Sequence, residues 1–297
     1  MMKSFHASYT LLLIVFLGLL LVGSSALAQT NQEETTRMLV GKINQKGLEK
    51  PPYNQWFSKN YQDYEVKTPA LELDKKAISQ LKIKIFLGTW CGDSKREVPR
   101  FLKIATHLGI VPDQIEMIAL KRNRKSPTDE HKGLYIHHVP TFIITRQGQE
   151  LGRIVEEPSE SLETDFAKIA QQKPYTPHFS GSEYLLALFQ TKGNAYVQEN
   201  LPNIGKKLKL QVKNQWELLR LAYILSINDR TPEALTICQL ADQLYPKSIS
   251  VWLAIARYSS PKTAIKTARW HYQKVLQIDP YNYEAIRGLE RLSKSGD

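Results

Sequence analysis

The chain has 297 residues, with 40 lysines and arginines against 29 acidic residues, a formal net charge of +11, and two cysteines. Its 42% apolar content suffices for a hydrophobic core and excludes a disordered tail, and two cysteines are too few for a small disulfide-built scaffold. The length favours two domains or one large domain.

The N-terminal segment has the pattern of a secretory signal peptide. Lys3 is followed by an apolar run from Leu11 to Val22 and then by Ala26-Leu27-Ala28. This pattern predicts a signal peptide over residues 1–28, cleaved after Ala28, and a periplasmic or secreted protein. If the apolar stretch from Tyr9 is retained, it forms a single membrane anchor instead. Both interpretations place the rest of the chain outside the cytoplasm.

The next part of the chain alternates between expected helices and strands. An N-terminal extension, residues 29–61, includes a helix expected around Glu33 to Ile43. From residue 62 to residue 172 the order β-α-β, a hairpin and a final helix predicts a mixed sheet flanked by helices. The expected helices are Asp74–Leu81, with Asp74 as N-cap, Ser94–His107 and Ser161–Ala170; the expected strands are Lys82–Gly88, Ile115–Leu120, Thr141–Thr145 and Glu150–Val155, the last two joined around Gly148.

The C-terminal part is expected to be all-helical. Residues 173–213 form a helical connector, with a helix at Glu183–Gln190 and breaks at Pro202 and Gly205. In residues 214–297, pairs of similar positions recur 34 residues apart. The pairs are Ala234 and Ala268, Cys238 and Tyr272, Leu244 and Ile278, and Pro246 and Pro280. A two-helix unit of this length, with Trp216 or Trp252 early and proline at its end, resembles the tetratricopeptide repeat. A generic pair of helical hairpins is the alternative.

The sharpest motif is Thr89-Trp90-Cys91-Gly92-Asp93-Ser94-Lys95, which joins an expected strand to an expected helix. The free N–H groups and the dipole at a helix start favour negative charge, so a thiol there is more easily converted to the nucleophilic thiolate. Lys95 adds positive potential in the first turn, and Asp93 works against it.

This stretch resembles the active site of the thioredoxin family. Trp90 precedes the nucleophile position, Gly92 follows it, and Pro99 stands where the family's active-site helix is kinked. Downstream, the segment with Val139 and Pro140 resembles the one that carries the family's cis-proline. The resemblance covers about residues 62–172 and implies an α/β thioredoxin-like domain, with Cys91 as nucleophile and a cis bond before Pro140.

The departures from the family pattern bear on activity. The second cysteine of the family's C-x-x-C motif is replaced by Ser94, whose hydroxyl cannot resolve a mixed disulfide, so release needs another thiol. Ser94 is expected instead to donate a hydrogen bond to the Cys91 thiolate. The buried acid that the family often carries six residues before the nucleophile is replaced by Ile85.

Three interpretations of Cys91 follow. It is a single nucleophile for thiol–disulfide exchange or isomerisation on protein clients; or the fold is a non-catalytic, protein-binding or chaperone-like scaffold; or Cys91 pairs with Cys238, although packing inside a repeat is the default for Cys238. On the first interpretation Cys91 and Ser94 are the catalytic residues, and the residues that shape the site are Trp90, Gly92, Asp93, Lys95, Val139 and Pro140.

The remaining motifs bear on partners. The basic run Lys121 to Lys125 is either a positive rim of the site or a solvated loop, and His137 and His138 either face Cys91 or lie on the surface. Most of the positive excess lies in residues 201–297, which suits a groove for acidic segments. The expected partners are therefore protein clients with cysteines or acidic segments. We expect no cofactor, metal or nucleic acid, and a membrane only if the signal is retained.

Overall fold

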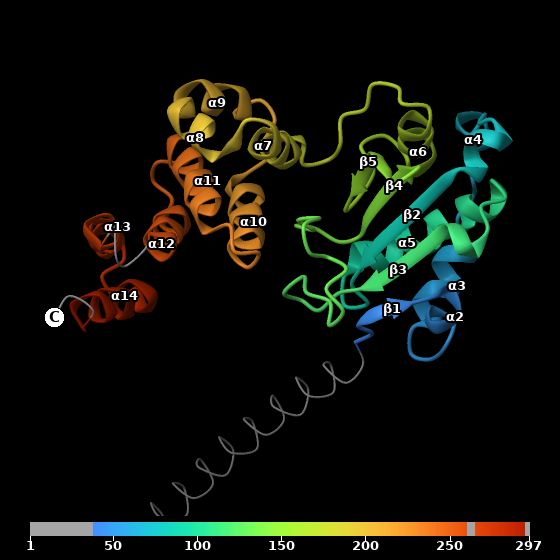
Figure 1. Cartoon of the computed structure of the whole chain (residues 1–297). Coiled ribbons are helices and arrows are strands. Elements are labelled where there is room, and N and C mark those ends of the chain that lie inside the picture. Colours follow the sequence, from blue (N-terminus) through green and yellow to red (C-terminus); the bar gives the residue numbers. More distant parts are fainter. Residues whose placement is uncertain (1–37, 260–264, 295–297) are drawn as a thin grey trace, which may run out of the picture.

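The computed structural model describes residues 38–259 and 265–294. The predicted signal peptide and the first five residues of the helix expected from Glu33 to Ile43 lie outside these residues. Figure 1 shows an α/β domain followed by an all-helical domain, as the sequence predicted. Among the described residues, no helix is both long and apolar enough to cross a bilayer.

The α/β domain is built on a mixed five-stranded sheet. Its strands are β1 (Gly41–Ile43), β2 (Leu81–Leu87), β3 (Ile115–Ala119), β4 (Thr141–Arg146) and β5 (Gln149–Val155), in the spatial order β1-β3-β2-β4-β5. β2 and β3 run parallel, and the other pairs are antiparallel. Leu81, Ile83, Ile85 and Leu87 of the central strand β2 are buried in the core that the helices share with the sheet. On the other face of β2, Lys82 is exposed and Phe86 packs in a smaller cluster with Ile136 and Val139.

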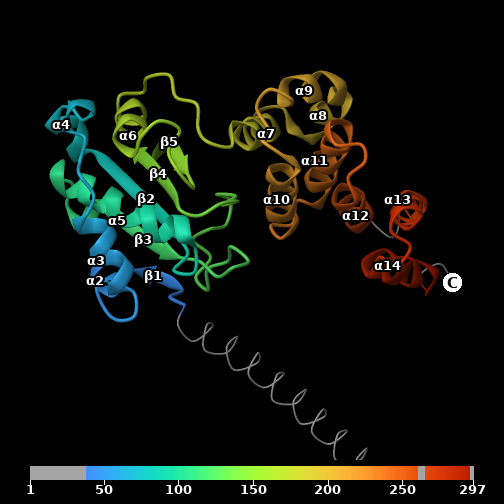
Figure 2. The same ribbon diagram turned by 180° about the vertical axis from the view of Figure 1, so that it is seen from behind.

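Helices cover this sheet and close its core. They are α2 (Gln45–Leu48), α3 (Asn54–Gln62), α4 (Lys75–Ser79), α5 (Gly92–His107) and α6 (Leu162–Ala170), with short 3₁₀ turns at Thr68–Ala70 and Pro112–Gln114 (Figure 2). Asp74 caps α4 by accepting from the backbone of Lys76 and Ala77, as predicted. Phe101 of α5 packs against Phe142 of β4 and Phe166 of α6, with ring centroids 4.6 and 5.7 Å away. These aromatic contacts fix α5 on the sheet.

The prediction of a helix ending at Ile43 is wrong for the residues that are described. Gly41–Ile43 is the edge strand β1, which pairs antiparallel with β3 from Gly41 opposite Ala119 onward. Gly41 has φ +85°, which a right-handed helix does not allow. Leu48 and Phe57, further along the extension, are buried in the main core of the domain. The extension is therefore part of the α/β domain.

The helical domain contains eight described helices. They are α7 (Ser180–Thr191), α8 (Gly193–Glu199), α9 (Leu201–Leu208), α10 (Gln215–Ser226), α11 (Thr231–Leu244), α12 (Ile249–Tyr258), α13 (Ile265–Ile278) and α14 (Tyr283–Lys294). The expected breaks at Pro202 and Gly205 are wrong, because both lie inside α9. Proline is tolerated in the first turn of a helix, and a Cβ on Gly205 would lie 2.7 Å from the Gln243 side chain of α11.

Two of the repeat pairs are buried alike in the helical domain. Ala234 and Ala268 are both buried at helix contacts, as are Cys238 and Tyr272. α7, α8 and α9 contribute side chains to the same core as α10 and α11, so the helical domain begins with α7. Trp252 is buried and donates its indole N–H to Asp242 at 2.8 Å. Trp216, the matching residue of the first unit, is 55% exposed.

Candidate active site

Cys91 lies in the turn between β2 and α5. Its backbone N–H donates to the carbonyl of Gly88 at 2.8 Å, and its own carbonyl accepts from Lys95 at 3.1 Å, which makes Cys91 the N-cap residue of α5. The turn is tight at Gly88, where a Cβ would lie 2.6 Å from the Trp90 indole. The sequence motif therefore folds into a strand-to-helix turn that places the thiol at the helix N-terminus.

The Cys91 side chain is partly buried against the segment that precedes β4. Its Sγ donates to the carbonyl of Val139 at 3.2 Å and lies 3.8 Å from Asp93 Oδ2. The Val139–Pro140 peptide bond is cis. The structure thus brings Cys91, Asp93 and Val139 together from two parts of the chain 48 residues apart.

Ser94 stabilises the turn rather than contacting the thiol. Its side chain is fully buried, and its Oγ accepts the backbone N–H of Gly88 at 3.1 Å. The expected hydrogen bond from Ser94 to Cys91 is not among those formed by the described residues. Ser94 therefore acts on Cys91 through the shape of the turn.

Trp90 is held beside the thiol by a neighbouring loop. Its indole N–H donates to the carbonyl of Leu120 at 2.8 Å, and the guanidinium groups of Arg122 and Arg124 lie 5.3 and 4.7 Å from its ring centroid. The basic run is thus more than a solvated loop, because Arg124 packs against Trp90 and is partly buried. Burial lowers the pKa of Arg124 to about 10, and the positive charge of Arg220 on α10 contributes.

Charged residues of the first turn of α5 are mostly paired. Arg96 contacts Asp93 at 3.0 Å, Glu157 at 3.6 Å and also the buried Glu97.

Gly92 is exposed, and a Cβ there would meet nothing within 4 Å, so its turn does not require glycine sterically. Lys95 lines a pocket of about 270 Å³ together with Trp90, Tyr53 and Trp56. This pocket adjoins the turn that carries the thiol.

His137 and His138 lie at the contact between the two domains, buried rather than on the surface. His137 Nε2 lies 3.0 Å from Glu183 Oε1 of α7, and the His138 ring stacks on Phe179 with centroids 3.8 Å apart. Burial, and then the neighbouring His137, lower the pKa of His138 well below its usual range. His138 is therefore neutral near pH 7 and supplies no positive charge to the thiol.

Residues of both domains hold the rest of the segment that leads to Val139. Arg153 of β5 donates to the carbonyl of Leu134 at 3.0 Å and lies 3.9 Å from Glu183. Arg230, at the start of α11, stacks over Tyr135 with its guanidinium 5.0 Å from the ring centroid. Sequence reasoning missed Glu183 and Arg230, since no local motif marks residues whose partners lie in the other domain.

Cys238 is remote from this chemistry. Both cysteines are free, and Cys238 is fully buried in the core of the helical domain. Burial raises the pKa of its thiol to about 12. Cys238 is thus packed as a small apolar side chain, and the disulfide with Cys91 is not formed. Among the described residues, no group of three or more His, Cys, Asp or Glu side chains could hold a metal ion.

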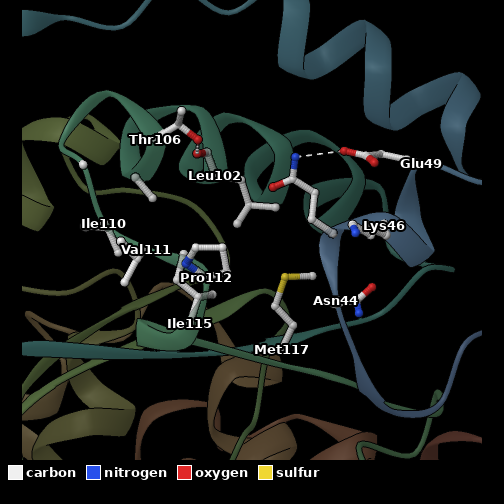
Figure 3. A pocket seen from close by; sticks show the side chains of 13 residues that line it. Asn44, Lys46, Glu49, Leu102, Thr106, Ile110, Val111, Pro112, Ile115 and Met117 are labelled. Carbon is white, nitrogen blue, oxygen red and sulfur yellow. Dashed lines mark hydrogen bonds between the residues drawn. The ribbon is translucent and has the colours of Figure 1, made fainter.

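A second pocket lies away from the thiol. Figure 3 shows this hollow of about 640 Å³ between α2 and the C-terminal half of α5, with Leu102, Ile110 and Met117 on its walls. Gln45 and Glu49 are hydrogen-bonded across its rim at 2.9 Å. Because Cys91 is at the opposite end of α5, this pocket takes no part in the arrangement around the thiol.

The fold and the repeats define the class of protein: a thioredoxin-like α/β domain followed by tetratricopeptide-like helical repeats. The chain is similar to the "TPR repeat-containing thioredoxin TDX" of Arabidopsis thaliana, with 32% identity over 111 residues. The match covers 37% of this chain and 27% of the length of that protein. No protein-family model and no solved structure match the chain.

Proposed function

We propose that this protein carries out thiol–disulfide exchange on protein clients with Cys91 as its single nucleophile. The observation that carries the proposal is the partly exposed Cys91 thiol at the N-terminus of α5. A helix N-terminus favours the thiolate, and solvent access lets a disulfide approach.

The exchange balances without a cofactor. The Cys91 thiolate attacks one sulfur of a client disulfide; a new S–S bond forms, the old one breaks, and the second client sulfur leaves as a thiolate. A different thiolate of the client, or the thiolate of an added low-molecular-weight thiol, then attacks the client sulfur of the mixed disulfide; that S–S bond breaks and Cys91 leaves as a thiolate. Attack by a client thiolate gives isomerisation with no net oxidation. Attack by an added thiol leaves that thiol joined to the client by a disulfide.

The other predicted site residues support Cys91 in this proposal. Ser94 holds the turn through Gly88, and Trp90 forms the wall beside the thiol. Val139 and Pro140 form the opposite wall. Asp93, Gly92 and Lys95 shape the first turn of α5, where Asp93 forms an ion pair with Arg96.

The helical repeats support protein clients as substrates, because such repeats serve protein–protein interaction in general. A client held by the helical domain would be presented to Cys91 at high effective concentration. We also propose a periplasmic or secreted location, where client disulfides persist.

Covalent trapping tests this function. Native extracts are incubated with the full chain and quenched with N-ethylmaleimide, and mixed disulfides are counted on non-reducing gels. Wild type and Cys238→Ala are expected to trap the same partners, whereas Cys91→Ala traps none. Trapping that persists in Cys91→Ala at the wild-type level contradicts a nucleophilic role for Cys91.

A non-catalytic scaffold is the second candidate, and one observation favours it. Ile85 is fully buried where the thioredoxin family often has an acid, and Ser94 replaces the resolving thiol. A scaffold needs neither group. It predicts that Cys91→Ala retains both partner binding and biological activity, and the same extracts, analysed by non-covalent pull-down, measure that binding.

A further inference from the structure

We infer that the pocket beside Trp90 binds an aromatic side chain of the client, from a residue next to the client cysteine that reacts with Cys91. This inference rests on the proposed function and specifies its substrate class: client segments in which phenylalanine, tyrosine or tryptophan adjoins the cysteine or disulfide. The pocket has a volume of about 270 Å³, and Tyr53, Trp56 and Lys95 are among the residues that line it with Trp90.

The pocket lies against the turn that carries the nucleophile. Trp90 immediately precedes Cys91, and Lys95 follows one helical turn later, with its backbone N–H donating to the Cys91 carbonyl at 3.1 Å. Two of the lining residues therefore lie on either side of Cys91 in the chain. Consecutive Cα atoms are only about 3.8 Å apart, so a client sulfur that reaches Cys91 brings the neighbouring client side chains close to these two residues.

The N-terminal extension builds the other wall of the pocket. Tyr53 comes directly before α3 and Trp56 lies in its first turn, and both pack against the main core of the α/β domain. The Trp56 ring meets the buried Phe57 edge to face, with the ring centroids 6.2 Å apart. The backbone N–H of Leu39 donates to the Thr89 hydroxyl at 3.2 Å, which ties the extension to the turn. Packing and hydrogen bonding therefore hold this wall in place.

The lining favours an aromatic occupant. Three of its eight residues, Tyr53, Trp56 and Trp90, carry aromatic rings. Aromatic rings attract one another in offset-stacked or edge-to-face contacts, and this attraction adds to the effect of burying apolar surface. An aromatic client side chain therefore gains more in this pocket than an aliphatic one of similar size.

Lys95 supplies a positive charge to the same pocket. Its side chain is partly buried, and the ion pairs among the described residues leave it out, whereas the neighbouring Arg96 is paired with Asp93 at 3.0 Å. An ammonium group is attracted to the face of an aromatic ring, as the 3.9 Å contact of Lys274 with the Trp252 ring illustrates in the helical domain. An aromatic occupant gains this second interaction, which an aliphatic occupant lacks.

Symmetrical disulfides of short peptides test the inference on the full chain. The peptides carry phenylalanine, leucine or glutamate directly before or directly after their cysteine, and mass spectrometry follows the rate at which each forms a mixed disulfide with Cys91. All chains carry Cys238→Ala, so Cys91 is their only thiol. With phenylalanine on at least one side of the cysteine, the rate is expected to exceed that of the matching leucine peptide about three- to tenfold, the effect of one aromatic contact.

Variants of the lining assign this preference to the pocket. Trp56→Ala is expected to bring the ratio of the phenylalanine rate to the leucine rate close to one, and Trp56→Phe retains most of the ratio. Lys95→Gln removes only a charge, so it tests the pocket even if Trp56→Ala fails to fold, and it should lower the ratio about twofold. Trp270→Ala, which removes a half-exposed tryptophan of α13, is the matched control and should leave the ratio unchanged.

The outcomes separate this inference from the proposed function. A chain with the wild-type pocket in which Cys91 reacts with none of the peptides overturns both. Reaction with all of them, at equal rates for phenylalanine and leucine on both sides of the cysteine, overturns the aromatic pocket alone. A ratio that persists in both Trp56→Ala and Lys95→Gln shows that the preference arises elsewhere and also overturns it. Fastest reaction with a glutamate peptide overturns it in favour of an acidic occupant.

Discussion

The contact between Glu183 and His137 should control how accessible Cys91 is. Glu183→Ala removes the 3.0 Å contact to His137 and the longer interaction with Arg153, and it leaves the buried His137 Nε2 without its partner. Loss of a charge-assisted hydrogen bond of this kind costs about 1.5–3 kcal/mol. Because His137 is two residues before Val139, the segment that covers the thiol loses its support from α7.

The assay is the rate of Cys91 alkylation by iodoacetamide at pH 7, followed by mass spectrometry. Glu183→Ala is expected to alkylate severalfold faster than wild type, since the Val139 carbonyl is no longer held against the sulfur. Glu199→Ala, an exposed glutamate of α8, is the matched control and should alkylate at the wild-type rate. An unchanged rate in Glu183→Ala, with a lowered urea midpoint that shows the contact was lost, would refute the reasoning.

Acid should weaken the same contact. Burial alone raises the pKa of Glu183, but the hydrogen bond and charge of His137 and the charge of Arg153 outweigh it, so the pKa is lowered from its ordinary value of 4.5. A carboxyl with a lowered pKa in the folded protein stabilises it above the ordinary value, and that stability is lost as the pH falls through the folded-state value. The alkylation difference between wild type and Glu183→Ala should therefore shrink below about pH 4.5.

Two further predictions follow from the turn. Ser94→Cys supplies an internal thiol one helical turn from the nucleophile, so mixed disulfides in the trapping assay should become short-lived and fall in yield. Gly88→Ala places a Cβ 2.6 Å from the Trp90 indole and should lower the free energy of unfolding by about 1–3 kcal/mol in urea, whereas Gly92→Ala, with open space, should cost far less.

Local patterns were enough to predict much of the α/β domain. Three of its features depend only on residues close together in the chain, so they are visible in the sequence. They are the alternating apolar residues of β2, the helical spacing of apolar residues in α5, and the glycine of the β4–β5 hairpin. β1 was missed because a three-residue strand is defined by its pairing with Ala119 and the residues around it, about 80 positions away. Pro202 was misinterpreted because proline is tolerated in the first turn of a helix, which is where it lies in α9. Gly205 was misinterpreted because it lies inside α9, where a Cβ would lie 2.7 Å from the Gln243 side chain.

The candidate site was predicted only in part for a related reason. The motif around Cys91 is local, and the resemblance to thioredoxins joined it to Val139 and Pro140. The roles of Ser94 and Arg124 depend on partners in the folded protein. Ser94 turned out to bind Gly88, and Arg124 to stack on Trp90, which its place in a basic run did not indicate.

The most direct test of the central claim is turnover on a protein with scrambled disulfides. The full chain is mixed at pH 7 with a disulfide-scrambled small enzyme and a trace of neutral thiol, and the recovery of that enzyme's activity is followed. Single-nucleophile exchange at Cys91 predicts faster recovery with wild type and Cys238→Ala than with Cys91→Ala, which should match the thiol alone. Equal recovery with wild type and Cys91→Ala would contradict the claim and favour the scaffold.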